Sequence, residues 1–220
     1  MFDNIAQTYD FLNLLLSFRM DYIWRKKSIQ TIENNPKKIL DIATGTADFA
    51  IIAAKYTNAK ITGIDISEKM LSIGNEKIKK NKLSNRILLK LADAEKLPFE
   101  NNSFQAITAG FGVRNFQNID TGLSEMYRVL DKDGVVVILE PSKPSLSPIK
   151  QLYNIYFTHI LPLVGKIISK DKKAYTYLTN SVNAFPPKKI FLKKLEDIGF
   201  KHCKHTSLTF GIVSLYSAKK

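Results

Sequence analysis

Hydrophobic and polar residues alternate along this chain in two different spacings. Short apolar runs, several of them rich in β-branched residues, have the length and pattern of buried strands. These runs are "KKILDIA" (37–43), "AKITGID" (59–65), "RILLKLAD" (86–93), "FQAITAG" (104–110) and "GVVVILE" (134–140). Between them, apolar residues recur every three or four positions, as in amphipathic helices. The alternation predicts β-α-β units in a doubly wound, Rossmann-like α/β fold with a mostly parallel sheet.

The predicted helices are bounded by residues typical of helix ends. They are "DFAIIAAKY" (48–56), "SEKMLSIGNEKIKKN" (67–81) and "NIDTGLSEMYRVLDKDG" (118–134). Ser67 is a candidate N-terminal cap, as is Asn118 or Asp120, and Gly134 is a candidate C-terminal end. In such a fold the ligand lies at the carboxyl ends of the strands, near the point where the strand order reverses.

Three further segments complete the predicted domain, which spans residues 1–220. The stretches 202–210 and 211–220 are predicted to form an antiparallel hairpin at the sheet edge. Residues 2–34 precede the first strand and form an N-terminal helical cap. Residues 143–183 form a helical insertion after the fifth strand, on the substrate side. Both helical segments are candidates for a lid over the carboxyl edge of the sheet.

Composition places the chain in a reducing compartment. Its single cysteine, Cys203, cannot form an internal disulfide and is expected to be an ordinary strand residue. The N-terminus lacks the basic and apolar regions of a signal peptide. The apolar stretch 155–168 is interrupted by polar and helix-breaking residues and is too short to span a bilayer. We therefore expect a cytoplasmic protein without a transmembrane helix.

The positive charge is concentrated in the last third of the chain. Of the formal net charge of +13, residues 143–220 contribute 14 lysines and 3 acidic residues, a net +11. These bases include no arginine, the residue that best reads phosphates and guanines through paired hydrogen bonds. Attraction to an anionic membrane surface is therefore favoured over nucleic-acid binding, although simple solvation of the lysines is an equal alternative.

The turn "ATGTAD" after the first predicted strand indicates which cofactor binds. A loop that wraps a pyrophosphate normally uses three glycines, whereas this turn has Gly45 alone. S-adenosylmethionine carries no phosphate, and its cationic groups favour nearby acids such as Asp41 and Asp48. Asp65 ends the second strand, at the spacing where a carboxylate accepts from ribose hydroxyls. Asp93 ends the third, where it can accept from the adenine amino group. Acids at strand ends also occur as helix caps, but four of them in this order favour a cofactor site.

Several motifs in the sequence are similar to those of one known family. They are "LDIATGTAD", "GIDISEKML", "DAEKLPFENNSF", "YDFLNLLLSF", "FGVRN", "MYRVLDKDG", "LEPSKP" and "YFTHILPLVGKIISKDKKAYTYLTNSV". The first three resemble class I S-adenosylmethionine-dependent methyltransferases. The others resemble, within that class, the quinone-biosynthesis C-methyltransferases that act on demethylmenaquinol and on the methoxy-benzoquinol precursor of ubiquinone. The resemblance extends from Ala6 to the C-terminus.

This resemblance implies the cofactor site. It places contacts with S-adenosylmethionine at Thr46, Asp65, Asp93 and Ala94, beside the turn at Gly45, and Tyr9 is expected to close over the cofactor. Some family members have a serine just before "FG". This chain has Gly110 there, which leaves only a backbone contact.

Methylation of an aromatic carbon requires an electron-rich quinol whose hydroxyl is at least partly deprotonated. Arg114, beside Asn115, is the leading candidate to stabilise the phenolate, and an ion pair of Arg114 with Asp120 or Glu125 is the alternative. His159 is a candidate general base, or a structural residue. Four tyrosines are candidates to line an apolar tunnel for a prenyl tail, or ordinary core residues: Tyr153, Tyr156, Tyr175 and Tyr177.

The expected partners are a prenylated quinol and, transiently, an anionic membrane surface. No metal and no nucleic acid are expected, and a homodimer is left open. The most favoured reaction is demethylmenaquinol to menaquinol, with the ubiquinone step as a second option. Three alternatives remain: a methyltransferase for another phenol or amine, a non-catalytic cofactor-binding subunit of a quinone-biosynthesis assembly, and a nicotinamide dehydrogenase. The absence of G-x-G-x-x-G disfavours the last.

Overall fold

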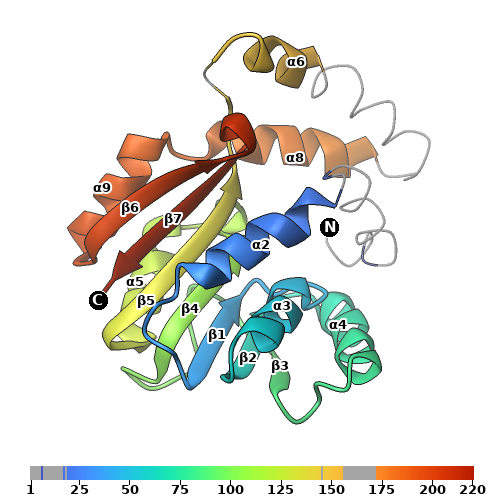
Figure 1. Ribbon diagram of the computed structural model, residues 1–220, viewed down its shortest axis with the longest axis vertical. Helices are drawn as coiled ribbons and strands as arrows, with labels where there is room; N and C mark the ends of the chain where they lie inside the picture. Colours follow the sequence, from blue (N-terminus) through green and yellow to red (C-terminus); the bar gives the residue numbers. More distant parts are fainter. Residues whose placement is uncertain (1–5, 7–16, 18, 145, 156–171) are drawn as a thin grey trace.

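A single twisted sheet organises the part of the chain that the structure describes. The computed structural model describes residues 6, 17, 19–144, 146–155 and 172–220, and within them seven strands have the order β3-β2-β1-β4-β5-β7-β6 (Figure 1). The strands are β1 (Lys38–Ile42), β2 (Lys60–Asp65), β3 (Ile87–Leu91), β4 (Phe104–Gly110), β5 (Leu130–Pro141), β6 (Lys201–Leu208) and β7 (Val213–Lys219). Strands β1 to β5 are parallel, and β7 pairs antiparallel with β5 and β6. The predicted sheet and its antiparallel edge pair are confirmed.

The helices follow the predicted segments closely. They are α2 (Met20–Gln30), α3 (Asp48–Tyr56), α4 (Glu68–Lys80), α5 (Ile119–Val129), α6 (Ile149–Ile155), α8 (Lys172–Ala184) and α9 (Lys188–Ile198), with short 3-10 helices η1 (Val113–Asn115) and η3 (Thr209–Gly211). Helix α2 lies within the proposed cap, α6 lies within the proposed insertion, and α8 ends one residue after it. Much of both segments lies outside the described residues, so their extents stay predictions. No helix in the described ranges has the length and apolarity needed to cross a membrane.

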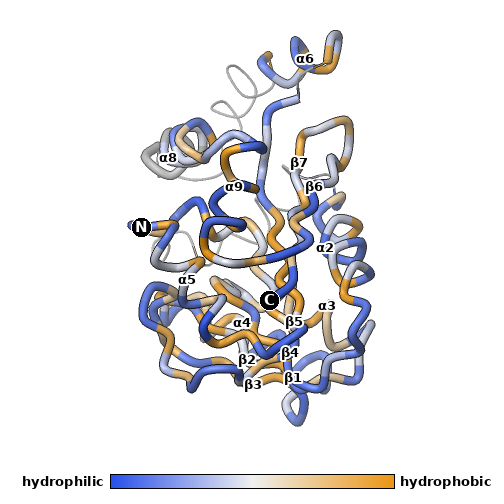
Figure 2. Tube along the Cα trace, turned by 90° about the vertical axis from the view of Figure 1, so that its left-hand side faces the viewer, coloured by the Kyte–Doolittle hydropathy of each residue, from blue (hydrophilic) through white to orange (hydrophobic). Residues whose placement is uncertain are grey.

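Both faces of the sheet are covered because its central strands are apolar on both sides. Successive side chains of a strand point to opposite faces. Accordingly Ile39 belongs to the core cluster beneath α2 and α3, whereas its neighbour Leu40 belongs to the cluster beneath α5 and α9. Val137 and Ile138 of β5 divide in the same way. Figure 2 shows the apolar strands between α2 and α3 on one side and α5 on the other.

The helix ends confirm two predicted caps and correct a third. The Ser67 hydroxyl accepts the Met70 N–H at 3.2 Å, and Asn118, rather than Asp120, caps α5 by accepting the Thr121 N–H at 3.1 Å. Gly134 does not end a helix. The chain passes from α5 straight into β5 at Leu130, and Gly134 lies inside that strand, where the pairing with β4 shifts register. Gly134, five residues beyond the end of α5, therefore marks an irregularity in a strand instead of the end of a helix.

Candidate active site

A cavity of about 280 Å³ opens at the carboxyl ends of β1, β2, β3 and β4. It lies where the strand order reverses, between β1 and β4, as expected for an open α/β sheet. Its lining includes six of the predicted site residues: Gly45, Asp65, Asp93, Ala94, Gly110 and Asn115. The sequence had placed these residues on four separate loops, and the fold brings them to one wall.

The turn after β1 has an unusual backbone. Ala43, Gly45 and Ala47 all have positive φ angles, of 52°, 55° and 66°, so every second residue is left-handed. Within the turn, the Thr44 N–H donates to the Ile64 carbonyl at 2.8 Å and the Ala47 N–H to the Thr44 carbonyl at 2.9 Å. A Cβ at Gly45 would meet no atom within 4 Å, so glycine is favoured there by its backbone angle and by the open cavity in front of it.

Asp41 fastens this turn to the sheet. Its carboxylate is fully buried and accepts the hydroxyls of Thr44 and Thr108, both at 2.6 Å. Burial raises the pKa of Asp41 to about 6, although the two threonine hydrogen bonds oppose the shift. Asp41 is absent from the cavity lining. Its role in the structure is to hold Thr44, and with it the start of the turn.

Asp65 joins the turn to the end of β2. Its Oδ2 accepts the Gly45 N–H at 2.8 Å, and its Oδ1 accepts the Ser67 N–H at 2.9 Å. The carboxylate lines the cavity and is half-buried. Each carboxylate oxygen can accept more than one hydrogen bond, so these backbone contacts fix the orientation of Asp65 and leave it able to accept from a ligand.

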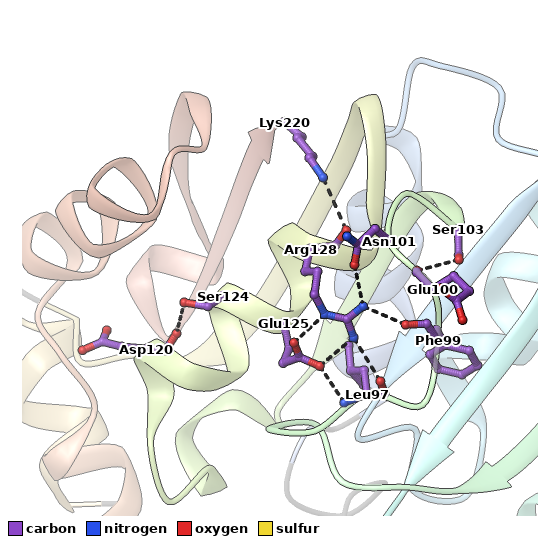
Figure 3. A network of polar contacts seen from close by, with 10 residues as sticks. All are labelled: Leu97, Phe99, Glu100, Asn101, Ser103, Asp120, Ser124, Glu125, Arg128 and Lys220. Atoms are coloured by element: carbon purple, nitrogen blue, oxygen red, sulfur yellow. Dashed lines mark hydrogen bonds and ion pairs between the residues drawn. The ribbon is translucent and has the colours of Figure 1, made fainter.

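The loop after β3 is clamped to α5. Arg128 donates to the carbonyls of Leu97 and Phe99, at 3.0 and 2.7 Å, while its partner Glu125 accepts the Leu97 N–H at 2.8 Å (Figure 3). The ion pair with Arg128 lowers the pKa of Glu125. These contacts hold the loop that carries Asp93 and places it at the cavity.

Glu95 extends the same clamp into the cavity wall. Its carboxylate accepts the backbone N–H groups of Gln117 and Asn118 at 2.6 and 3.1 Å. Asp93 in turn accepts the Glu95 N–H at 2.9 Å. Glu95 and Gln117 both line the cavity. Glu95 was not among the residues predicted from the sequence, because the role of an acid inside a loop depends on backbone partners that only the fold supplies.

Gly110 is required by packing as well as by the cavity. A Cβ added there would lie 2.7 Å from Cδ1 of Phe49, whose side chain is buried on α3. The aromatic ring therefore occupies the space that a side chain at position 110 would need. This contact explains physically why the chain has glycine where some family members have serine.

Arg114 forms a buried ion pair, but not with either predicted partner. Its guanidinium contacts Glu140 of β5 at 3.0 Å and donates to the carbonyl of Phe111. Asp120 pairs instead with Lys194, and Glu125 with Arg128. Burial raises the pKa of Glu140, and the charge of Arg114 opposes that shift. The alternative pairing proposed from sequence was wrong because spacing along α5 did not reveal that β5 lies beneath η1.

Asn115 connects the cavity to the insertion. Its Oδ1 accepts the hydroxyl of Tyr177 on α8 at 3.1 Å. Helix α8 thus contacts the cavity wall, and a lid formed by the insertion stays a prediction. Tyr153 on α6 is buried, and burial raises the pKa of its hydroxyl. The positions of His159, Tyr9 and Tyr156 and the side chain of Tyr175 lie outside the described residues.

Of the predicted cofactor residues that the structure describes, Thr46 is the one absent from the cavity lining. Its side chain is buried and accepts from Nζ of Lys77, at 3.1 Å, and Lys77 also pairs with Asp48. The Thr46 hydroxyl therefore serves the packing of α4 against the turn. A contact between Thr46 and a cofactor remains a prediction.

The cavity lining favours a cation over an anion. Among the described residues that line it are three carboxylates, on Asp65, Asp93 and Glu95, and no lysine, arginine or histidine. A pyrophosphate would meet net negative charge here, whereas sulfonium and ammonium groups would be stabilised. Ile66, 71% exposed, and Phe111 and Phe116 supply apolar surface that the sequence analysis had not singled out.

Known proteins are similar to this chain in sequence and in fold. A profile of the ubiE/COQ5 methyltransferase family matches residues 1–220. A demethylmenaquinone methyltransferase from Bacteroides fragilis is 46% identical over 222 residues, covering all of this chain and 91% of that protein. A ubiquinone/menaquinone biosynthesis C-methyltransferase UbiE from Geotalea daltonii is 44% identical over 223 residues, with 100% and 94% coverage.

Solved structures agree on the fold. A SAM-dependent methyltransferase from Aquifex aeolicus superimposes with a TM-score of 0.66 at 16% identity, covering 91% of this chain and 92% of that one. Phosphoethanolamine N-methyltransferase 2 of Haemonchus contortus, solved with S-adenosyl-L-methionine, gives a TM-score of 0.61 at 18% identity and covers 84% of this chain and 48% of that one. From its full-length match and its relatives above 40% identity, the chain belongs to the ubiE/COQ5 methyltransferase family.

Proposed function

We propose that this protein transfers a methyl group from S-adenosylmethionine to a ring carbon of a prenylated quinol, with demethylmenaquinol as the first choice of substrate. The names of the most similar relatives support this choice. The main observation behind this proposal is the cavity at the point where the strand order reverses. Its described lining residues include three carboxylates and Asn115, and no lysine, arginine or histidine. The methoxy-benzoquinol step of ubiquinone synthesis is the second choice.

The residues of the cavity fit the proposed cofactor. S-adenosylmethionine supplies a methyl group bound to a positively charged sulfur. Asp65, held by Gly45 and Ser67, would accept from the ribose hydroxyls, and Asp93 from the adenine amino group beside the Ala94 N–H. Ile66, exposed beside them, would cover the flat face of the adenine.

On the substrate side, Asn115 is the proposed donor to the quinol oxygen. Its Oδ1 accepts from Tyr177, which fixes the amide, and the two amide N–H groups are donors without a hydrogen-bond partner among the described residues. A donor at this position would stabilise the oxygen as it gains negative charge and makes the ring carbon nucleophilic. The carbon that gains the methyl group must afterwards lose its proton to a base.

Arg114 is proposed to stabilise the same oxygen in two ways. Its positive charge would attract the oxygen, and its contacts hold η1, which carries Asn115, in place. Its side chain is 9% exposed, and its Nε is buried with no hydrogen-bond partner among the described residues. The pair with Glu140 fixes the backbone next to Asn115. Roles for His159 as the base and for Tyr9 as a cover over the cofactor remain part of the proposal.

A prenylated quinol dissolves in the bilayer, so the enzyme that uses it must visit a membrane surface. We therefore retain the proposal of transient contact with anionic lipid, with no nucleic acid partner. Transfer from a sulfonium requires no metal, so none is part of the proposal. Dimer formation stays open.

The test is an assay of the purified protein with methyl-labelled S-adenosylmethionine and reduced naphthoquinols or benzoquinols of short and long tails. We expect label in the ring of the naphthoquinol, and weaker or no transfer to small phenols and amines. Binding of S-adenosylmethionine without transfer to any quinol would favour a non-catalytic subunit and contradict the proposal. Thermal stabilisation by NAD instead of S-adenosylmethionine would contradict the cofactor assignment.

A further inference from the structure

An exposed aromatic residue stands at the tip of the β6–β7 connection. Phe210 in η3 is 75% exposed and has φ 57° and ψ 22°, which is left-handed. Thr209 before it also has a positive φ, of 45°. Non-glycine residues adopt this conformation at an energetic cost, and a bulky aromatic rarely does. Two consecutive such residues place a large apolar ring in solvent, which is opposite to what folding alone favours.

The surrounding structure enforces this geometry. Thr209 Oγ1 accepts from Nε1 of the buried Trp24 at 2.8 Å. Ser142 donates its hydroxyl to the Gly211 carbonyl at 2.7 Å and its N–H to the Ile212 carbonyl at 2.8 Å. The turn is therefore fixed on both sides, and Phe210 is presented rigidly. Strained residues held in this way are typical of functional surfaces.

Apolar side chains of the neighbouring segment are exposed at the same end of the molecule. A Cβ at Gly211 would lie 3.5 Å from Cα of Pro144, so the chain leading to α6 runs against η3. Leu146 and Leu152, just before and within α6, are 70% and 63% exposed. Figures 1 and 2 both show α6 and the β6–β7 turn at this end.

The charged side chains described on this segment are lysines. Lys143 and Lys150 are exposed on the same segment, and Lys188 reaches the turn, where its Nζ contacts Ser207 at 3.2 Å. The described residues between Ser142 and Leu195 include no aspartate or glutamate. An apolar tip ringed by lysines is complementary to an anionic bilayer, in which aromatic and leucine side chains enter the interface and lysines meet the headgroups.

We propose that Phe210, Leu146 and Leu152, with Lys143 and Lys150, form a membrane-docking surface, here called the apical surface. This inference deepens the proposed function, since a quinol substrate gives the enzyme a reason to visit a bilayer. The apical surface begins just after β5. Glu140, the partner of Arg114, lies at the end of that strand, three residues before Lys143. Docking there brings the insertion side of the cavity toward the lipid.

The test uses the full chain and vesicles of phosphatidylethanolamine with phosphatidylglycerol, compared with neutral phosphatidylcholine vesicles. Phe210→Asn removes the ring and suits the left-handed backbone, so folding should be retained. We expect wild type to bind the anionic vesicles in a salt-sensitive manner, and Phe210→Asn to bind at least about tenfold more weakly. Lys143→Glu with Lys150→Glu should give a similar loss. Leu88→Thr, which removes an exposed leucine from the far edge strand β3, is the matched control and should bind as wild type.

Unchanged vesicle binding by Phe210→Asn and by the double lysine variant would overturn the apical surface. So would equal binding to neutral vesicles, or a wild-type dimer that Phe210→Asn converts to a monomer, which would assign the surface to a second copy of the chain. Activity on a water-soluble, short-tailed quinol should stay within about twofold in all variants. Vesicle binding is read without turnover, so absence of quinol methylation would count against the proposed function and leave the binding result to decide the docking surface.

Discussion

The hydroxyl of Tyr177 donates a hydrogen bond to Oδ1 of Asn115 at 3.1 Å, joining α8 of the insertion to the η1 turn on the cavity wall. The two residues are 62 positions apart. A hydrogen bond to the amide oxygen limits the rotation of the amide, and so fixes the direction of the two N–H groups that it can offer to a substrate. Tyr177 therefore orients Asn115. The effect of this contact on catalysis can be measured separately from cofactor binding.

Replacing Tyr177 with phenylalanine should lower kcat/KM for the quinol about fivefold, because the loss of one hydrogen bond of about 1 kcal/mol leaves the Asn115 amide free to rotate. Affinity for S-adenosylmethionine, measured by calorimetry, should not change. Tyr22→Phe is the control, since it removes a hydroxyl that contacts Tyr56 at 2.9 Å on an exposed surface. An equal effect in both variants would show that the Asn115 contact has no special role.

Asp65→Ala should weaken S-adenosylmethionine binding by about 2 to 4 kcal/mol, because charge-assisted hydrogen bonds to the ribose are lost. The same change frees the N–H groups of Gly45 and Ser67, so the turn should loosen as well. Calorimetric titration measures the affinity, and circular dichroism verifies that the chain still folds. Unaltered affinity would remove Asp65 from the site.

The Arg114–Glu140 pair predicts a contrast between single and double variants. Arg114→Met alone leaves Glu140 buried without its partner and should cost about 3 to 5 kcal/mol of unfolding free energy. Adding Glu140→Gln should restore most of that stability. If Arg114 stabilises the quinol oxygen, turnover of the double variant should remain at least about tenfold low while cofactor affinity is normal. Recovery of turnover together with stability would make Arg114 a purely structural residue.

Gly110→Ser should destabilise the protein and distort the cavity, since the new Cβ would lie 2.7 Å from the Phe49 ring. A clash of this kind typically costs about 1 to 3 kcal/mol. The double variant Gly110→Ser with Phe49→Ala should recover cofactor binding relative to Gly110→Ser alone. Thermal unfolding and calorimetry measure both effects, and a purely additive result would mean that the two positions do not interact.

Asp41 predicts a pH dependence of stability. Burial raises its folded-state pKa from 3.8 to about 6, so the folded protein holds this proton more tightly than the unfolded chain does. The contribution of Asp41 therefore favours folding at acid pH, and it is lost as pH rises from about 4 through about 6, by roughly 3 kcal/mol in total.

The check is urea unfolding of wild type and Asp41→Asn across this range. The stability of wild type relative to Asp41→Asn should fall as pH rises, because only wild type must ionise the buried group. A flat difference for Asp41→Asn would mean that the carboxyl titrates normally.

The sequence by itself determined the fold and the side of the sheet where the ligand binds. Apolar runs of strand length separated by amphipathic helices leave few alternatives to a parallel sheet, because each strand must be covered on both faces. Asp65, Asp93 and Gly45 could be located for a related reason. They end or follow strands whose carboxyl ends must meet, and their positions depend only on local pattern and topology.

Only the tertiary structure decided what the polar residues contact. Arg114 pairs with Glu140 because β5 lies beneath η1, Gly110 makes room for Phe49 of α3, and Glu95 holds the N–H groups of Gln117 and Asn118. Phe210 gave no signal in the sequence, since a single aromatic in a turn is normally buried. Periodicity follows from repeated local geometry and so can be read along the chain, whereas these contacts depend on the distance between residues that only folding brings together.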